Sequence, residues 1–225
     1  MKLCIIVVLL VLLVTLLAVV PALTATFTED FNDGDMSGWL SSQNYAGSYG
    51  NWRVENEVMM QDQPGDGYIV LVDGLQFSTQ SIETRLKLHD PAGYGGFIIW
   101  HQALDTLLAV RLYPAGGGVW IHEISNGIGD ELVVYPYSSA YGTWYDLRVD
   151  ADSVNKELKV YINDVYLFTH ITSTDYRSGS SGLFGGNNGG YFDDFSLTNP
   201  VPEPSSLLVL GGGVVGLIGI RKRKE

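Results

Sequence analysis

Residues 83–88 read Glu-Thr-Arg-Leu-Lys-Leu, and this short stretch decides the fold class. Polar and apolar residues alternate in it, so successive side chains of a strand would face water and a core in turn. Between the two apolar ends of the chain, no segment has a sustained helical period of 3.6 residues. The stretch therefore predicts a half-buried β-strand in an all-β domain.

Other runs rich in Val, Ile, Tyr, Phe and Trp recur between clusters of Gly, Asn and Asp. They predict strands at 52–55, 58–61, 68–72, 81–88, 95–100, 107–113, 118–124, 132–135, 144–149, 158–162, 166–169 and 191–197. Asn163-Asp164 is a hairpin signal, and 55–57, 114–117 and 179–182 are expected to be turns. So many short strands predict a two-sheet antiparallel β-sandwich or jelly roll.

The N-terminal residues 1–25 have the features of a signal peptide. Lys2 supplies a positive charge, residues 4–20 form an apolar run, and small residues up to Ala25 offer a site for signal peptidase. A retained signal anchor is the alternative. Cys4, the only cysteine, lies within this apolar helix, so the mature protein is expected to have no disulfide.

The C-terminal residues 200–225 have three parts in a fixed order. Pro202-Glu203-Pro204 comes first, an apolar segment at 207–220 follows, and the basic cluster Arg221-Lys222-Arg223-Lys224 comes last. The apolar segment predicts an anchor helix, although it is shorter than the roughly 20 residues that cross a bilayer comfortably. The basic cluster would keep its end of that helix in the cytoplasm.

This tail resembles the PEP-CTERM sorting signal of Gram-negative bacteria that produce exopolysaccharide. The resemblance implies that the exported protein is held transiently in the inner membrane and is processed by an exosortase near the tripeptide. The protein would then reach the cell surface or the extracellular matrix. An ordinary C-terminal membrane anchor is the alternative.

One acidic domain, residues 26–199, remains between these ends. The whole chain has a formal net charge of −12, and the basic residues of the two ends make the remainder more acidic still. A surface of this charge argues against nucleic acid and anionic lipid as partners. It is compatible with neutral polysaccharide, with divalent cations or with solubility alone.

Several motifs along this domain carry a second resemblance. They are Asp30-Phe31-Asn32-Asp33-Gly34, Gly96-Phe97-Ile98-Ile99-Trp100, Gly182-Leu183-Phe184-Gly185 and Phe192-Asp193-Asp194-Phe195. In this order they resemble the concanavalin A-like lectin/glucanase superfamily, in its laminin-G-like and bacterial surface branches. The resemblance implies two packed antiparallel sheets, one of them often concave and presenting a glycan groove.

Four carboxylates are candidates for a structural calcium site. Glu29 and Asp30 belong to the expected first strand, and Asp193 and Asp194 belong to the last. The first and last strands of such sandwiches commonly pair, which would bring the four together. Calcium takes six to eight oxygen ligands and suits such a cluster. The alternative is that these side chains face solvent or cap turns.

The five Trp and thirteen Tyr of the chain suggest sugar stacking. We expect Trp100 and Trp120 on an exposed face, with His101 and Tyr113 beside them as further contacts. Burial in the core is the alternative for any Trp of a sandwich. It is the expectation for three others, Trp39, Trp52 and Trp144.

Catalysis is not expected. The superfamily's glucanases carry two glutamates flanking an aspartate on one strand, and the sequence contains no such run. Glu123 stands alone on its predicted strand. The leading hypothesis is a non-catalytic module that binds polysaccharide. A structural or adhesive matrix protein is the second, and a glycoside hydrolase-like enzyme is the third.

Overall fold

The computed structural model describes residues 26–44, 47–65, 67–125 and 128–199. Ala25–Pro200 form one compact unit. The predicted signal helix at 1–25 and the predicted anchor helix within 200–225 lie outside the described residues. Within those described ranges, no helix is both long and apolar enough to cross a membrane.

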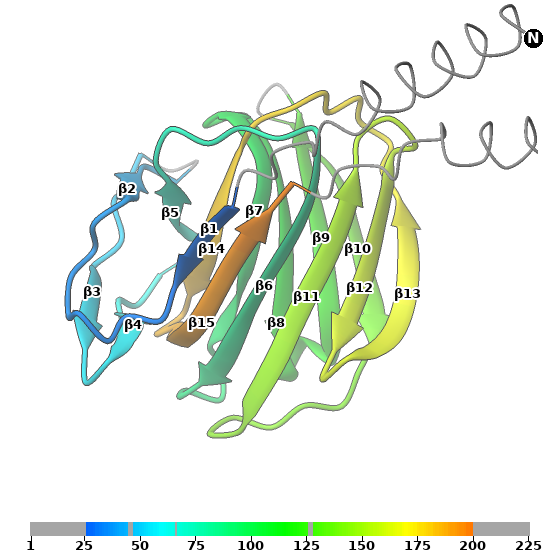
Figure 1. Cartoon of the computed structure of the whole chain (residues 1–225). Helices are drawn as coiled ribbons and strands as arrows, with labels where there is room; N and C mark the ends of the chain where they lie inside the picture. The colour runs from blue at the N-terminus through cyan, green and yellow to red at the C-terminus, as the bar shows by residue number, and fades with distance from the viewer. Residues whose placement is uncertain (1–25, 45–46, 66, 126–127, 200–225) are drawn as a thin grey trace, which may run out of the picture. The chain divides into compact units, whose positions relative to one another are not determined.

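The domain consists of two antiparallel sheets, which Figure 1 shows as two layers. Sheet A has the order β13 (Val165–Ile171), β12 (Glu157–Ile162), β11 (Trp144–Asp152), β6 (Thr79–Leu88), β15 (Gly190–Thr198), β4 (Val58–Gln61) and β3 (Trp52–Glu55), and β1 (Thr26–Glu29) also pairs with β15. Sheet B has the order β10 (Ile128–Pro136), β9 (Gly118–Ser125), β8 (Thr106–Tyr113), β7 (Tyr94–Ala103), β14 (Ser180–Gly186), β5 (Tyr68–Val72) and β2 (Trp39–Ser42).

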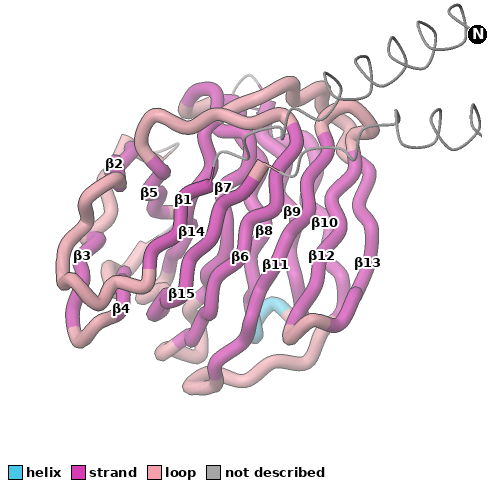
Figure 2. The backbone as a smooth tube through the Cα atoms, in the orientation of Figure 1, coloured by secondary structure: helices cyan, strands magenta, loops and turns pink. Residues whose placement is uncertain are grey.

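The predicted all-β sandwich is confirmed. Strands dominate the trace in Figure 2, and the short 3-10 helix η1 (Pro114–Gly116) is the one helix in the part of the chain that the structure describes. The alternation that predicted β6 is also observed, since Ile82 and Leu86 are fully buried between the sheets. Glu83 and Arg85 lie on the opposite, outer face of the same strand.

Two hairpins form where the sequence predicts them. Asn56 and Glu57, with φ of 53° and 61°, connect β3 to β4, and Asn163 and Asp164, with φ of 50° and 61°, connect β12 to β13. Two consecutive residues with positive φ give a two-residue turn whose twist matches that of the strands. Asn and Asp tolerate this region better than most residues do, which explains why the signal was reliable.

The turn expected at 179–182 is wrong, because Ser180 begins β14, which lies between β7 and β5. Its glycines mark close approach of neighbouring backbones and not a reversal of the chain. A Cβ added at Gly182 would meet the carbonyl oxygen of Val70 on β5. Glycine in this strand therefore serves the packing of three adjacent backbones.

The expectation that Trp100 lies on an exposed face is also wrong. Its side chain is 0% exposed and belongs to the core between the sheets. Trp100 has a φ of 54° at an irregularity in the pairing of β7 with β8, and this breaks the simple alternation of the strand. Its ring stacks on Tyr176 with centroids 5.8 Å apart, and its Nε1 donates to the carbonyl oxygen of Ser78 at 3.0 Å.

Trp100→Ala should lower the free energy of unfolding by about 3–5 kcal/mol, as expected for an aromatic side chain removed from a packed core. Urea denaturation of the full chain in detergent measures this loss. Tyr166→Ala is the matched control, because Tyr166 is 53% exposed. A loss for Trp100→Ala no larger than that of the control would contradict the core assignment.

Candidate functional site

The outer face of sheet B carries four aromatic rings around one guanidinium. We call this group the Arg111 cluster; its rings belong to Tyr94, Tyr113, Trp120 and Phe184. The Arg111 Cζ lies 4.4 Å from the ring centroid of Tyr94 and 5.2 Å from that of Trp120. The rings of Tyr113 and Trp120 meet edge to face with centroids 5.3 Å apart. Such contacts fix the rings and hold a cation over their faces.

Strand register explains why these side chains meet. Arg111 on β8 lies opposite Trp120 on β9 and opposite Gly96 on β7, where no side chain competes for the space. The indole Nε1 of Trp120 donates to the carbonyl oxygen of Gly116 in η1, at 3.0 Å. Tyr94 is only 2% exposed, whereas Trp120 and Tyr113 are half-buried. The cluster therefore has a fixed interior and two rings that reach solvent.

The structure brings together two of the four predicted sugar contacts, Trp120 and Tyr113. Trp100 is in the core, and His101 lies beside it beyond the irregularity in β7. Burial lowers the pKa of His101, and its Nε2 has no hydrogen-bond partner among the described residues. Sequence reasoning did not include Arg111, although its place in an otherwise apolar strand was a usable signal.

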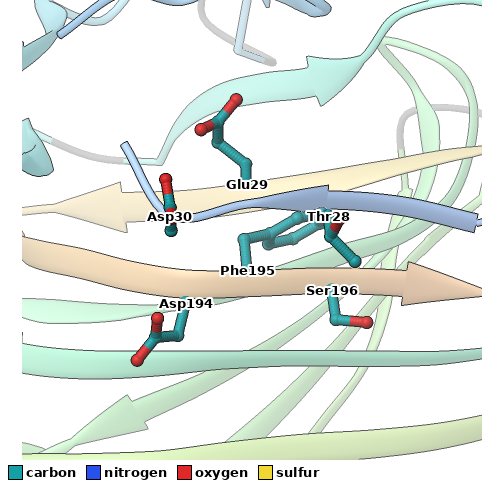
Figure 3. A pocket seen from close by; sticks show the side chains of 6 residues that line it. All are labelled: Thr28, Glu29, Asp30, Asp194, Phe195 and Ser196. Carbon is teal, nitrogen blue, oxygen red and sulfur yellow. The ribbon is translucent and has the colours of Figure 1, made fainter. Parts of the chain in front are cut away.

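The predicted pairing of the first and last strands is confirmed, since Glu29 on β1 lies opposite Phe195 on β15. A depression of about 470 Å³ lies at this junction, and Figure 3 shows the side chains that line it. In that view the carboxylate of Asp194 points away from those of Glu29 and Asp30. These three carboxylates therefore share a region of the surface without converging on one point.

These carboxylates already form ion pairs with Arg85 or accept hydrogen bonds from nearby backbone amides. The Nη1 of Arg85 lies 3.2 Å from Oδ2 of both Asp193 and Asp194. Glu29 accepts a hydrogen bond from the amide of Phe31, and the amide of Asn32 holds the pKa of Asp30 below its usual value. Burial raises the pKa of Asp193. Across the described ranges, no group of three or more Asp, Glu, His or Cys side chains is placed to hold a metal.

The other carboxylate singled out from the sequence, Glu123, is enclosed between the sheets and is 0% exposed. Its Oε1 lies 2.9 Å from His170 Nε2, and its carboxylate also accepts hydrogen bonds from Ser173 and Thr174 at 3.0–3.2 Å. Burial alone would raise the pKa of Glu123, but these hydrogen bonds outweigh it and the pKa is lowered. Glu123 thus ties β9 of sheet B to β13 of sheet A.

Residues 200–224 match the model of the PEP-CTERM protein-sorting motif. The chain carries a PEP-CTERM sorting motif. The match includes Pro202-Glu203-Pro204 and the basic cluster, and it indicates an exported protein that is sorted through exosortase. No curated protein matches the chain.

Solved structures resemble the domain. The carbohydrate-binding module CBM66 from Bacillus subtilis has a TM-score of 0.59 and 16% identity, over 72% of this chain and 96% of that one. The Bacillus licheniformis β-glucanase has a TM-score of 0.57 and 12% identity, over 79% and 99%. A lichenase derived from a mouse hindgut metagenome has a TM-score of 0.58 and 12% identity, over 79% of this chain and 100% of that one. At these identities the likeness shows the fold alone, and the predicted two-sheet jelly-roll sandwich is confirmed.

Calcium at the junction of β1 and β15 stays a prediction. If it binds, excess chelator should lower the melting temperature of the full chain in detergent, because a ligand at a hundred times its Kd stabilises the folded state by about 2.7 kcal/mol. Asp30→Asn should remove most of the effect of the chelator. An unchanged melting curve in excess chelator would rule out a stabilising site.

Glu123→Gln should make the stability less sensitive to acid. The lowered pKa of Glu123 stabilises the fold fully above its ordinary value of 4.5, and this contribution is lost as the pH falls through the folded-state pKa. The melting temperature of the wild type should therefore fall more steeply than that of the variant between about pH 6 and pH 3. The exposed Glu57→Gln is the control, and equal slopes for all three proteins would contradict the assignment.

Proposed function

We propose that the chain is an exported cell-surface or extracellular-matrix protein whose sandwich is a non-catalytic carbohydrate-binding module. The observation that carries the proposal is the pair of half-buried rings, Trp120 and Tyr113, held on the outer face of sheet B by Arg111 and Tyr94. Rigid aromatic faces bury apolar surface at low entropic cost, and the apolar face of a sugar ring is a suitable partner.

The charge of the chain supports a neutral ligand. A formal net charge of −12 repels acidic polymers at long range, whereas a neutral polysaccharide meets no such barrier. The similarity in fold to a carbohydrate-binding module and to glucanases is compatible with sugar binding on this architecture.

Two observations support a non-catalytic role. Retaining and inverting glycosidases need two carboxyl groups that flank the scissile bond. Gly96 and Ile98, the outward-facing residues at the centre of β7, carry no carboxylate. Glu123 lies on β9 of the same sheet. It is enclosed by its hydrogen-bond partners on β13 and in the loop that follows β13.

The alternative, an adhesive matrix protein without sugar specificity, is favoured by one feature. The edge strand β13 of sheet A has no Asp, Glu, Lys or Arg, and it exposes Val165 by 61% and Ile171 by 57%. An edge of this kind is a template for pairing with another strand. If the protein self-associates and is retained by no polysaccharide, this second function replaces the first.

Trp120→Ala should weaken retention in gels that contain the polysaccharide bound by the wild type. A central aromatic anchor contributes about 2 kcal/mol or more to such an interface, which is roughly a thirtyfold loss of affinity. A panel of mixed-linkage β-glucan, dextran, mannan and galactan identifies the polysaccharide, and affinity electrophoresis of the full chain in detergent measures the loss.

Tyr166→Ala is the matched control, because it removes an exposed ring from the opposite sheet. Both variants should melt cooperatively near the wild-type temperature. Retention of Trp120→Ala equal to that of the control would overturn the assignment of this surface, and a wild type retained by no member of the panel would overturn the proposed function.

We place the protein in a Gram-negative bacterium, held in the inner membrane by residues 207–220 until an exosortase acts near Pro202-Glu203-Pro204. Replacing the tripeptide with three alanines should leave an unprocessed, membrane-bound form. Intact-mass measurement of the released protein identifies the processing site. A released protein that still ends at Glu225 would contradict processing at this motif.

A further inference from the structure

The outer face of sheet A carries a second aromatic surface, which contains none of the residues of the Arg111 cluster. Trp144 on β11, Lys87 on β6, Tyr191 on β15 and Met60 on β4 lie opposite one another across four adjacent strands. We call this line of side chains the Trp144 row. Trp144 was expected in the core, but its register places it on the side of Asp146, away from the buried Leu147.

Lys87 is held between the two rings of the row. Its Nζ lies 4.7 Å from the ring centroid of Trp144 and 4.8 Å from that of Tyr191. The other two lysines of the described ranges, Lys156 and Lys159, each have a carboxylate oxygen within 4.0 Å. Lys87 has none in that part of the chain, so its ammonium keeps N–H donors for an oxygen-bearing ligand.

A depression of about 340 Å³ opens over this row. It is lined by Trp144, Tyr191 and Lys87, by the buried Met60, and by Glu55 at the end of β3 with Asn56 in the turn that follows. It therefore combines aromatic rings and apolar side chains with one ammonium, one carboxylate and one amide. This mixture of stacking and hydrogen-bonding groups is the usual composition of a small-ligand site.

We propose that the Trp144 row is a second carbohydrate-binding surface, which takes a neutral sugar ring of a polysaccharide chain. The ring packs against Trp144 and Tyr191, hydroxyl oxygens accept hydrogen bonds from Lys87, and hydroxyl groups donate to Glu55 or Asn56. The inference rests on the proposed function for the class of ligand and on separate residues for the site.

The charges select a neutral ligand over a charged one. An acidic sugar would be attracted by Lys87 but would meet more carboxylates than cations around it. Glu55 shares the cation Arg53 with Asp62, and the cation Arg85 is shared by Asp146, Asp193 and Asp194. A basic ligand would face Lys87 itself. Two hydroxyl groups of a neutral sugar can accept a hydrogen bond from Lys87 and donate one to Glu55 or Asn56. Such a sugar has no net charge that must be desolvated on binding.

Binding on both outer faces has a consequence for the polymer. The Arg111 cluster and the Trp144 row lie on different sheets, with the core of the sandwich between them. One polysaccharide chain on each face would be connected through a single domain. The protein would thus cross-link neutral polysaccharide chains and not only bind one of them.

Acetylation of lysines tests the second surface directly. The full chain in detergent is treated with sulfosuccinimidyl acetate, with and without the neutral polysaccharide that retains it, and each lysine is followed by peptide mass spectrometry. Bound polysaccharide should slow acetylation of Lys87 and leave Lys156 and Lys159 unchanged. Alginate, as the acidic comparison, should protect none of the three. If no neutral polysaccharide of the panel changes the acetylation rate of Lys87, the inference is overturned.

Variants separate this inference from the proposed function. Trp144→Ala combined with Tyr191→Ala should lower affinity about tenfold, which corresponds to 1.4 kcal/mol. Lys87→Met, which keeps the length of the side chain, should have a smaller effect in the same direction and serves if the double variant fails to fold. The control is Tyr161→Ala with Tyr166→Ala, a second ring pair on the same face whose cation, Arg148, already has Asp150 at 3.7 Å.

The outcomes are distinct. Loss of binding in Trp120→Ala with no protection of Lys87 leaves the proposed function standing and overturns the second surface. Protection of Lys87 that persists in Trp120→Ala supports the second surface, whatever the fate of the Arg111 cluster. Wild-type protein should also raise the viscosity of a polysaccharide solution, and variants of either face alone should bind without doing so. Equal viscosity with wild type and with both single-face variants would overturn cross-linking.

Discussion

The pairing of β15 with β6 is the contact on which sheet A depends. Among the described residues β15 is the last strand in sequence, yet it lies near the middle of the sheet, between β6 on one side and both β1 and β4 on the other. At the irregularity in this pairing, the buried Thr84 donates a hydrogen bond from Oγ1 to the carbonyl oxygen of Asp193 at 2.8 Å. Without β15, the strands β1, β3 and β4 have no connection to the rest of the sheet. Such non-local pairing makes folding depend on almost the whole domain at once.

The sequence predicts those parts of the fold in which each residue type is determined by its own strand face or its own backbone conformation. Alternation predicts β6, and two residues that tolerate positive φ predict the turn at Asn163-Asp164. β14 was missed because its glycines are required by neighbouring backbones, which no local pattern reveals. Trp100 was misplaced because the irregularity in β7 breaks the alternation there. The outward position of Trp144 was readable, since Leu147 and Val149 already assign the other face of β11 to the core.

Both candidate surfaces arise from the same physical rule. A sandwich buries one face of each sheet, and the two outer faces must be made from the remaining alternate residues. On sheet B those residues are largely apolar, and a second cluster that includes Ile69, Ile98 and Phe184 packs there without help from sheet A. On sheet A they are charged, with Arg85 and Lys87 placed over aromatic rings. Half-buried aromatic side chains thus lie on both outer faces, among apolar residues on sheet B and among charged residues on sheet A.

The position of β15 also connects the fold to the sorting of the protein. β15 ends at Thr198, and the matched sorting motif begins at residue 200. Sheet A can be completed only after Thr198 has left the exporting machinery, because β6, β4 and β1 all pair with this last strand. If the tail holds the chain at the membrane just beyond Thr198, as proposed above, the domain has time to complete these non-local pairs before release. In the proposed sorting, processing near Pro202-Glu203-Pro204 would separate the tail without removing a residue of β15, so the folded sheet would lose no hydrogen bond between its strands.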